Sequence, residues 1–284
     1  MIDLHVHSTF SDGTDSPEAL AYLAKDANLS AFALTDHDCL DGIELARSEA
    51  KKLGIEFVAG VEVSCQHPVY NNKSCHVLIY FVEQGSEPIG QVLQNLREDR
   101  KQRNQKMLER LNQLGVDLSM QEVAKFAGGQ ELARPHFAKA MVEKKIVKNV
   151  NEAFEKYLSD NAPAYVKKAH ITLKEIAKIA KDSKGLAVLA HPLRLNLKTN
   201  ELVNLFKELK DYGFVGAECY YGDYSLEDRN LLLEITKRAR LIPTGGSDYH
   251  GNNKEGLRLG IGRGDLCVPD EVLDALKAFK ALLK

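Results

Sequence analysis

The feature that most restricts the fold of this chain is the alternation of short apolar stretches with amphipathic segments. The apolar stretches have the length and composition of strands, and in chain order they are IDLHV, AFALT, IEFVA, HVLIYF and, after a long gap, LAVLA, GAECY and LIPT. Helices are predicted between them at 16–27, 41–53, 200–212 and 226–240. Strands that alternate with helices in this way are typical of a parallel α/β fold, so we expect an α/β protein with these stretches as its strands.

The strand pattern vanishes between about residues 88 and 183, where helical, charge-rich sequence replaces it. Part of this stretch must be an inserted helical subdomain, which we place at 100–168. The segments 1–99 and 169–284 then form the α/β domain. The run REDRKQRNQK is basic and polar, and it is more typical of a solvated helix face than of a nucleic-acid-binding stripe.

Composition narrows the class of protein. The chain has 284 residues, 44% of them hydrophobic, and a formal net charge of -2, which suits a globular protein and demands neither duplex nucleic acid nor a membrane as partner. No apolar run approaches the ~20 residues of a membrane span, and no signal-peptide pattern occurs at the start. The five cysteines are scattered and lack a CxxC pair, which indicates reduced thiols. We expect a cytoplasmic protein without a stable protein partner.

Three side chains of the kind that bind metals occur in the first dozen residues. His5 and His7 alternate on a predicted strand, so they face the same way, and the turn signal SDG lets Asp12 bend back toward them. Two imidazoles and a carboxylate suit a divalent ion such as zinc or manganese. An isolated pair of alternating histidines is more often part of a surface strand, so the rest of the chain must decide.

Residues of the same kind follow the other predicted strands. Functional residues of (β/α) barrels lie at the carboxyl ends of the strands, so a cluster there indicates a site. The residues at these positions are His5, His7, Asp12, Asp36, His37, Asp38, Glu62, His191, Asp248 and His250, with His76 at the start of the fourth strand. The sixth strand lacks a clear ligand, although Glu218, Tyr220 and Tyr221 lie at its end. Six of the nine histidines share this predicted rim, which favours a metal centre over a chance arrangement.

The other three histidines are interpreted one by one. His67 and His170 are expected in surface loops without a functional role. His136 follows Arg134 in LARPHFA, where the two side chains either hold a phosphate or mark the start of a helix. Both interpretations of this pair stay open.

The motifs HVHSTFSDG, LTDHD, GVEVS, CHVL, AHP and GGSDYHG occur in this order along the chain. With them the sequence resembles the PHP (polymerase and histidinol phosphatase) domain proteins over essentially its whole length. The resemblance implies a distorted (β/α)7 barrel with a multinuclear metal site at the strand ends. The insertion, with LARPHFAKAMVEK and APAYVKK, is further similar to a bacterial subgroup of nucleoside 3',5'-bisphosphate phosphatases and 5'→3' exoribonucleases.

The resemblance also implies ligands for two or three divalent ions. One ion would be bound by His5, His7, Glu62 and Asp248, a second by Glu62, His76 and His191, and a third by Asp12, His37 and His250. Some relatives carry histidine where this chain has Asp12, and a carboxylate there favours a harder ion such as manganese or magnesium over zinc. Iron is a further candidate.

The activity that the resemblance implies is hydrolysis of a phosphate ester on a nucleotide or a short single-stranded RNA. Asp248, His191 and Arg134 are the candidate catalytic residues, Arg134, His136 and Arg194 are the candidate substrate-binding residues, and Tyr220 or Tyr221 is a candidate for base stacking. The insertion is expected to act as a lid over the rim. Two alternatives are a phosphomonoesterase of the histidinol-phosphate type and a non-catalytic metal-binding accessory module.

Overall fold

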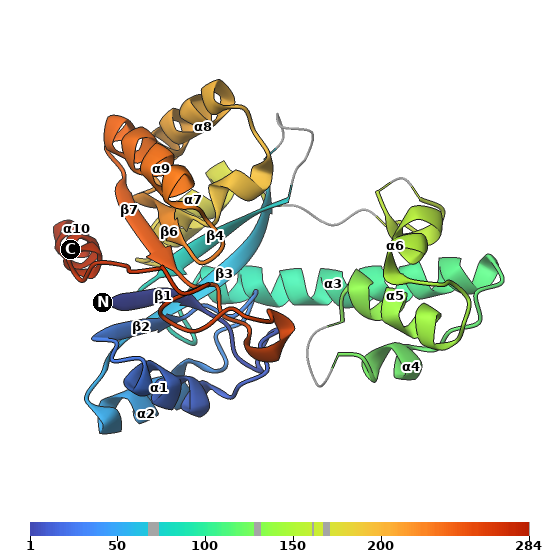
Figure 1. The fold of residues 1–284 in the computed structure, drawn as a ribbon. Helices are drawn as coiled ribbons and strands as arrows, with labels where there is room; N and C mark the ends of the chain where they lie inside the picture. Colours follow the sequence, from blue (N-terminus) through green and yellow to red (C-terminus); the bar gives the residue numbers. More distant parts are fainter. Residues whose placement is uncertain (68–73, 128–131, 161, 167–170, 284) are drawn as a thin grey trace. The chain divides into compact units, whose positions relative to one another are not determined.

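The computed structural model describes the whole chain apart from residues 68–73, 128–131, 161, 167–170 and 284. Contacts divide the chain into two compact units, of which the first consists of Met1–Leu93 and His170–Lys284 and the second of Gln94–Ala169. Helix α3, Ile89–Gln113, begins in the first unit and continues into the second (Figure 1). The expected insertion, 100–168, falls within the second unit, and its role as a lid stays a prediction.

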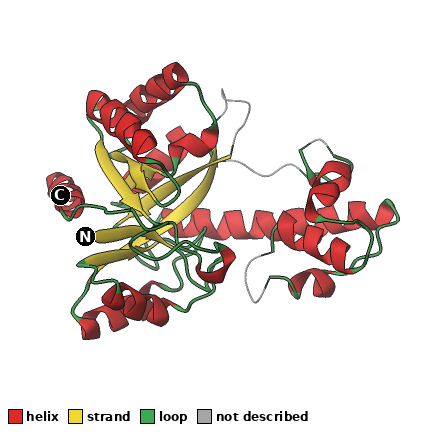
Figure 2. Ribbon diagram, viewed as in Figure 1, coloured by secondary structure: helices red, strands yellow, loops and turns green. Residues whose placement is uncertain are grey.

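The first unit is built on a sheet whose strands are hydrogen-bonded to one another in chain order (Figure 2). They are β1 (Ile2–Val6), β2 (Ala31–Leu34), β3 (Glu56–Gln66), β4 (Ser74–Tyr80), β5 (Leu186–Leu189), β6 (Gly216–Tyr221) and β7 (Ile242–Gly246). Past β7 the chain returns to β1, because the amide of Asp248 donates to the carbonyl of His5 over 2.9 Å. A side chain at Gly246 would lie 2.4 Å from the amide nitrogen of His5, so this close approach requires glycine. The sheet is therefore a nearly closed barrel, and the predicted (β/α)7 barrel is confirmed.

One strand departs from the parallel arrangement that the sequence predicts. Strand β4 runs antiparallel to β3 and to β5, whereas the other hydrogen-bonded neighbours are parallel. Only seven residues separate β3 from β4, and a parallel pair needs a crossover of about a dozen or more. The reversal explains why His76, at the start of its strand, lies beside the carboxyl ends of the others, opposite Ser64 of β3.

Helices of the first unit pack against these strands and against one another (Figure 1). They are α1 (Pro17–Asp26), α2 (Ile43–Leu53), α7 (Leu173–Asp182), α8 (Thr199–Tyr212), α9 (Leu226–Ala239) and α10 (Glu271–Leu282), with the short 3₁₀ helices η2 (Pro192–Leu195) and η3 (Gly251–Asn253) after β5 and β7. The four helices predicted between the strands are observed to within two residues at each end. Ser16 caps α1, because its Oγ accepts a hydrogen bond of 3.2 Å from the amide of Ala19, and Pro17 occupies the first helical position.

Apolar side chains from the strands and from α10 form the core of the barrel. Leu4, Ala33, Leu78, Val188 and Leu276 belong to this cluster, and each is at most 2% exposed. Burial of one large aliphatic side chain of this kind contributes roughly 1.5–3 kcal/mol of transfer free energy. The cluster therefore stabilises the strands of the barrel.

The second unit has an apolar core of its own. Besides the later turns of α3 it contains α4 (Met120–Ala124), α5 (Arg134–Glu143), α6 (Val150–Ala153) and the π-helical turn η1 (Phe154–Leu158). Among the residues buried together between these elements are Met107, Leu111, Phe137 and Met141. A separate core is the mark of a separate domain. None of the helices in the described part of the chain, α3 included, is both long and apolar enough to cross a membrane.

Candidate metal centre

The residues predicted as metal ligands come together at one rim of the barrel. They lie on β1, in the turn after β1, after β2, on β3, at the start of β4, after β5 and after β7. His5 and His7 point to the same side of β1, as their alternation predicts, and both are fully buried. Together they make up the set His5, His7, Asp12, His37, Glu62, His76, His191, Asp248 and His250.

Glu62 lies at the centre of this set and is 1% exposed. Its Oε1 is 2.9 Å from Nδ1 of His76 and 2.9 Å from Nε2 of His191. Its Oε2 is 3.2 Å from Nε2 of His5 and 3.1 Å from Nε2 of His7. The two oxygens of one carboxylate thus face two separate pairs of imidazoles, which is the arrangement of a residue that bridges two ions.

Asp248 completes the group around His5 and His7. Its Oδ1 is 3.4 Å from Nε2 of each histidine, and the two Nε2 atoms are only 3.1 Å apart. The two nitrogens can share one N–H as a hydrogen bond, or both can direct a lone pair to a metal ion. Ligand atoms of His5, His7, Glu62 and Asp248 all lie within 4.8 Å of one another, so this group matches the set predicted for one ion.

Two further groups of possible ligands share residues with the first. Asp12 Oδ1 is 3.1 Å from Nε2 of His250, and its Oδ2 is 3.7 Å from Nε2 of His37. His7 joins these three within the same 4.8 Å limit. His37 also has its Nδ1 3.2 Å from Oε2 of Glu62, and it groups with Glu62 and His76. The structure therefore places His37 between two groups, whereas the sequence assigned it to one.

The chemistry of these donors fits divalent cations. Nδ1 of His37 is buried and, although close to Glu62, makes no hydrogen bond with suitable geometry in the described part of the structure. A buried polar atom without a hydrogen bond is costly unless it has another partner, such as a metal ion. Imidazole nitrogens and carboxylate oxygens are ligands for zinc, iron and manganese alike.

Other side chains fix the orientation of the ligands. Nδ1 of His5 donates to Oε1 of Glu218 over 2.9 Å, and the amide of His191 donates to Oε2 of Glu218 over 2.7 Å. Nδ1 of His250 donates to the carbonyl of Asp248 over 2.8 Å. The two bonds donated by Nδ1 leave Nε2 of His5 and of His250 with its lone pair toward the site, as outer partners of metal-binding histidines do. Glu218, which was not among the predicted ligands, is thus a positioning residue.

Protonation states at the rim suit cation binding. Burial alone would raise the pKa of Glu62, but the imidazoles of His37, His5 and His76 lower it well below the usual value. Burial lowers the pKa of His37 to about 3, so this imidazole is neutral near pH 7. Burial opposes protonation of His7, yet hydrogen bonds to Asp248 and Glu62 raise its pKa to about 9. A site of this kind favours positive charge, and a divalent ion competes for it with protons.

Two cations lie beside Asp248 at the rim. Nη1 of Arg194 is 3.7 Å from Oδ2 of Asp248 and 3.3 Å from the hydroxyl of Tyr221, and its side chain is 57% exposed. Lys254 contacts the same Oδ2 through Nζ. Sequence reasoning missed Lys254, which lies in a charged loop with no motif to mark it. Tyr221 is 1% exposed and donates to Asp248 over 2.6 Å, so it packs within the site and offers no face for base stacking.

Arg134 and His136 lie in the second unit, at the start of α5. Nη1 of Arg134 is 2.8 Å from Oδ1 of Asp160 and donates to the carbonyl of Leu158 over 3.1 Å. Nδ1 of His136 accepts a hydrogen bond of 3.1 Å from the amide of Ala133, as a capping residue does. These contacts are those of residues that mark the start of a helix, which is one of the two interpretations of the sequence. A role of Arg134 and His136 in substrate binding stays a prediction.

Several other residues singled out in the sequence have different surroundings from those expected. His67 is 2% exposed, with Nε2 3.3 Å from Oε2 of Glu208, so the prediction of a surface position is wrong. Glu208 belongs to α8, so His67 lies against that helix. Asp36 is buried and accepts a hydrogen bond of 2.7 Å from the amide of Ser8, which ties the turn after β1 to the end of β2. His170 lies outside the described residues.

The sequence of this chain is similar to those of known proteins. The PHP domain family matches residues 3–184. A 3',5'-nucleoside bisphosphate phosphatase of Chromobacterium violaceum is 30% identical over 91% of this chain and 90% of its own length. A 5'-3' exoribonuclease of Haemophilus influenzae is 30% identical over 87% and 89%. A phosphoribosyl 1,2-cyclic phosphate 1,2-diphosphodiesterase of Eggerthella lenta is 29% identical over 88% and 94%.

Solved structures agree with the sequence relatives. A protein of Bifidobacterium adolescentis assigned as a metal-dependent phosphoesterase has a TM-score of 0.79 at 27% identity, covering 98% of this chain and 95% of that one. A Chromobacterium violaceum structure described as an amidohydrolase with bound sulfate and no metal has a TM-score of 0.81 at 29% identity, covering 98% and 96%. With the fold and these relatives in agreement, the chain belongs to the PHP domain family and is a metal-dependent phosphoesterase.

Proposed function

We propose that this phosphoesterase converts nucleoside 3',5'-bisphosphates to 5'-monophosphates and trims short RNA from a 5'-phosphorylated end. The observation that carries the proposal is Glu62, whose two oxygens face two pairs of imidazoles from three different segments of the chain. A bridged pair of ions is a recurring device for phosphate ester hydrolysis. The names of the Chromobacterium violaceum and Haemophilus influenzae relatives support the choice of substrate.

The proposed ligands follow the groups described above. His5, His7, Glu62 and Asp248 would hold one ion, Glu62, His76 and His191 a second, and Asp12, His37 and His250 a third. The carboxylate of Asp12 favours a hard ion in the third group, so manganese is our first choice, with zinc, magnesium and iron as the others. The short distance from Nδ1 of His37 to Glu62 supports a contribution of His37 to the second ion as well.

Bound ions would supply an activated water and neutralise charge on the phosphate oxygens. The residues of the chain then have the tasks of binding and orientation. Asp248 is held from one side by the hydroxyl of Tyr221 and from another by Lys254, so its carboxylate is fixed where it can orient the attacking water. Arg194 and Lys254 bring two cations to the same edge, and a phosphate oxygen is the natural partner of a guanidinium.

The two proposed activities are chemically one. An anchored 5'-phosphate would fix the position of the first nucleoside while the phosphorus on its 3' side is attacked. Cleavage of a monoester or of a diester there leaves the 3' oxygen on that nucleoside in both cases. We propose Arg194 as an anchor of this 5'-phosphate, together with Arg134 and His136 of the insertion.

The experiment is a comparison of phosphate esters with the manganese-loaded protein. We expect turnover of a nucleoside 3',5'-bisphosphate at least about tenfold faster than that of the corresponding 3'-monophosphate, because the 5'-phosphate contributes binding without being cleaved. Histidinol phosphate and a ribosyl 1,2-cyclic phosphate complete the panel, the second because of the Eggerthella lenta relative. Faster hydrolysis of either compound than of any nucleotide would reject the proposed substrate.

A further inference from the structure

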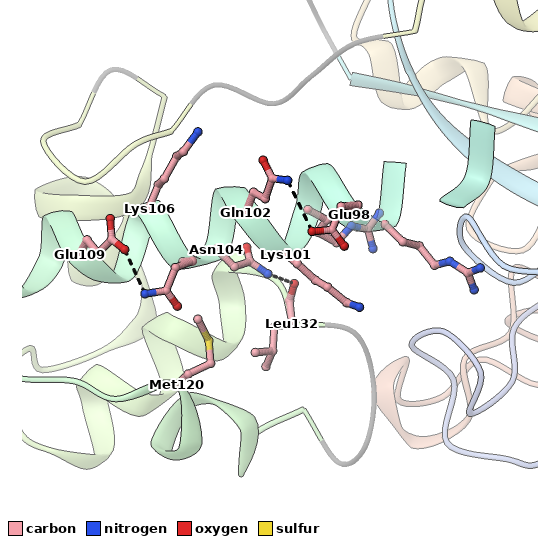
Figure 3. A pocket seen from close by; sticks show the side chains of 11 residues that line it. Glu98, Lys101, Gln102, Asn104, Lys106, Glu109, Met120 and Leu132 are labelled. Carbon is pink, nitrogen blue, oxygen red and sulfur yellow. Dashed lines mark hydrogen bonds between the residues drawn. The ribbon is translucent and has the colours of Figure 1, made fainter. Parts of the chain in front are cut away.

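A groove in the second unit has no part in the site described above. Its volume is about 680 Å³, and its walls are α3, Met120 of α4 and Leu132 (Figure 3). Residues of α3 from Arg97 to Glu109 line it, which is about 18 Å of helix at 1.5 Å per residue. A groove of this volume is in the range of ligand-binding sites.

The groove and the unit that contains it are basic, whereas the barrel is acidic. Residues 94–169 include 15 basic and 10 acidic residues, while the rest of the chain has 23 basic and 30 acidic ones. Four of the groove-lining residues are basic and two are acidic. Lys101 and Lys106 are exposed, and no ion pair involves either lysine in the described part of the chain. This charge distribution favours a polyanionic ligand at the second unit.

The uncharged residues of the groove indicate which polyanion fits. Two exposed side-chain amides, Gln102 and Gln105, lie between the lysines along α3, and Met120 and Leu132 add apolar surface. The amide of Asn104 donates to the carbonyl of Leu132 over 2.7 Å, so the wall beside α3 is fixed in place (Figure 3). Cations and amides along the groove, with apolar surface on one side of it, suit an unpaired strand, whose phosphates, base edges and base faces are all accessible.

We propose that this groove binds single-stranded RNA through Lys101 and Lys106, as a second contact for an RNA chain apart from the metal centre. The proposal goes beyond hydrolysis of a single nucleotide, and it rests on the proposed function only for the choice of RNA as the polyanion. In the sequence alone the basic run of α3 was more typical of a solvated face. The groove changes that interpretation, because it adds apolar and amide groups beside the charges.

The test measures binding separately from catalysis. Full-length protein is titrated, in the presence of chelator so that no cleavage occurs, into a fluorescent oligouridine of about 12 nucleotides, and anisotropy is recorded at several salt concentrations. We expect the variant K101E/K106E to bind at least about tenfold more weakly than the parent protein. The slope of log affinity against log salt should also fall by about 1.4, since each phosphate contact of a single strand contributes about 0.7.

A matched control carries the same charge change elsewhere in the same unit. Lys139 and Lys148 are exposed and do not line the groove, so K139E/K148E tests for an effect of net charge alone. Equal weakening of RNA binding in both double variants would overturn the proposal. Displacement of the RNA by an equal concentration of polyglutamate would also overturn it, because it would indicate an acidic protein partner. Hydrolysis of a nucleoside bisphosphate, measured in parallel, should stay within about twofold of the parent in both variants, so failure of the groove and failure of the proposed substrate are distinguishable.

Discussion

At the scale of single residues, Glu62 is the central residue of the candidate metal centre. It is buried at the centre of five imidazoles, all within 3.2 Å of one of its two oxygens. The same imidazoles keep its pKa well below the usual value in spite of burial, so the carboxylate is ionised near pH 7. A residue with this many partners affects every ion that those partners hold.

Replacement of Glu62 by glutamine should therefore remove metal from two positions. We expect Glu62→Gln to lose more than one ion per chain and to reduce phosphate release by more than about 100-fold, beyond the usual effect of changes outside the ligand shell. Elemental analysis of protein purified without chelator measures the metal content. Asp12→Asn is the comparison, because it should affect only the third group, and equal losses in the two variants would contradict the bridging role.

Glu218 should act on metal affinity rather than on the reaction itself. It holds Nδ1 of His5 and the amide of His191 but is not among the grouped ligands. We expect Glu218→Gln to weaken metal binding about 10–100-fold, with activity restored by excess manganese. A metal titration followed by activity separates this from a catalytic role, in which excess metal would restore nothing.

At the scale of elements, β4 and α5 show how context changes the meaning of a motif. His76 begins its strand, yet the antiparallel direction of β4 brings it to the rim where the other strands end. Arg134 begins α5, where Asp160 and the carbonyl of Leu158 already engage its guanidinium. A guanidinium has five N–H donors, so these two contacts leave donors for a phosphate.

A kinetic comparison tests Arg134 as an anchor. We expect Arg134→Ala to raise KM for a nucleoside 3',5'-bisphosphate by about tenfold more than for a 3'-monophosphate, because only the first substrate carries the phosphate to be anchored. Asp160→Asn removes the ion pair and keeps the guanidinium, so it serves as the control for a structural effect. Equal changes in KM for both substrates would show that Arg134 only stabilises the second unit.

At the scale of the whole molecule, the barrel and the helical unit have separate apolar cores. The buried charges of the rim all belong to the barrel. Cations that bind there are bound by the folded barrel and not by the unfolded chain, in which the ligands are far apart. Metal should therefore stabilise one unit directly.

Metal-dependent unfolding tests this expectation. Manganese at about 100 times its dissociation constant should add about 2.7 kcal/mol to the stability of the barrel, a rise of roughly 5–10 °C in its Tm. Differential scanning calorimetry with manganese and with chelator measures the shift. The same experiment on Glu62→Gln should show little change, and an equal Tm with and without metal in the parent protein would contradict a metal centre in the barrel.

The sequence by itself determined the order and type of the elements. Periods of two and of 3.6 residues are local properties, so the strands, the four predicted helices and the common face of His5 and His7 followed from residues close together in the chain. The motifs at the strand ends also indicated the ligand set, because a barrel brings all such ends to one rim.

Only the tertiary structure decided which of these residues meet. The contacts of Glu62 with imidazoles from four segments and the support that Glu218 gives to His5 join positions far apart in sequence. The reversal of β4 and the approach of Lys254 to Asp248 join nearer positions that no motif marks. Such distances depend on strand direction, on register and on closure of the barrel between β7 and β1. Those are set by the packing of the whole sheet, and no local pattern of residues records them.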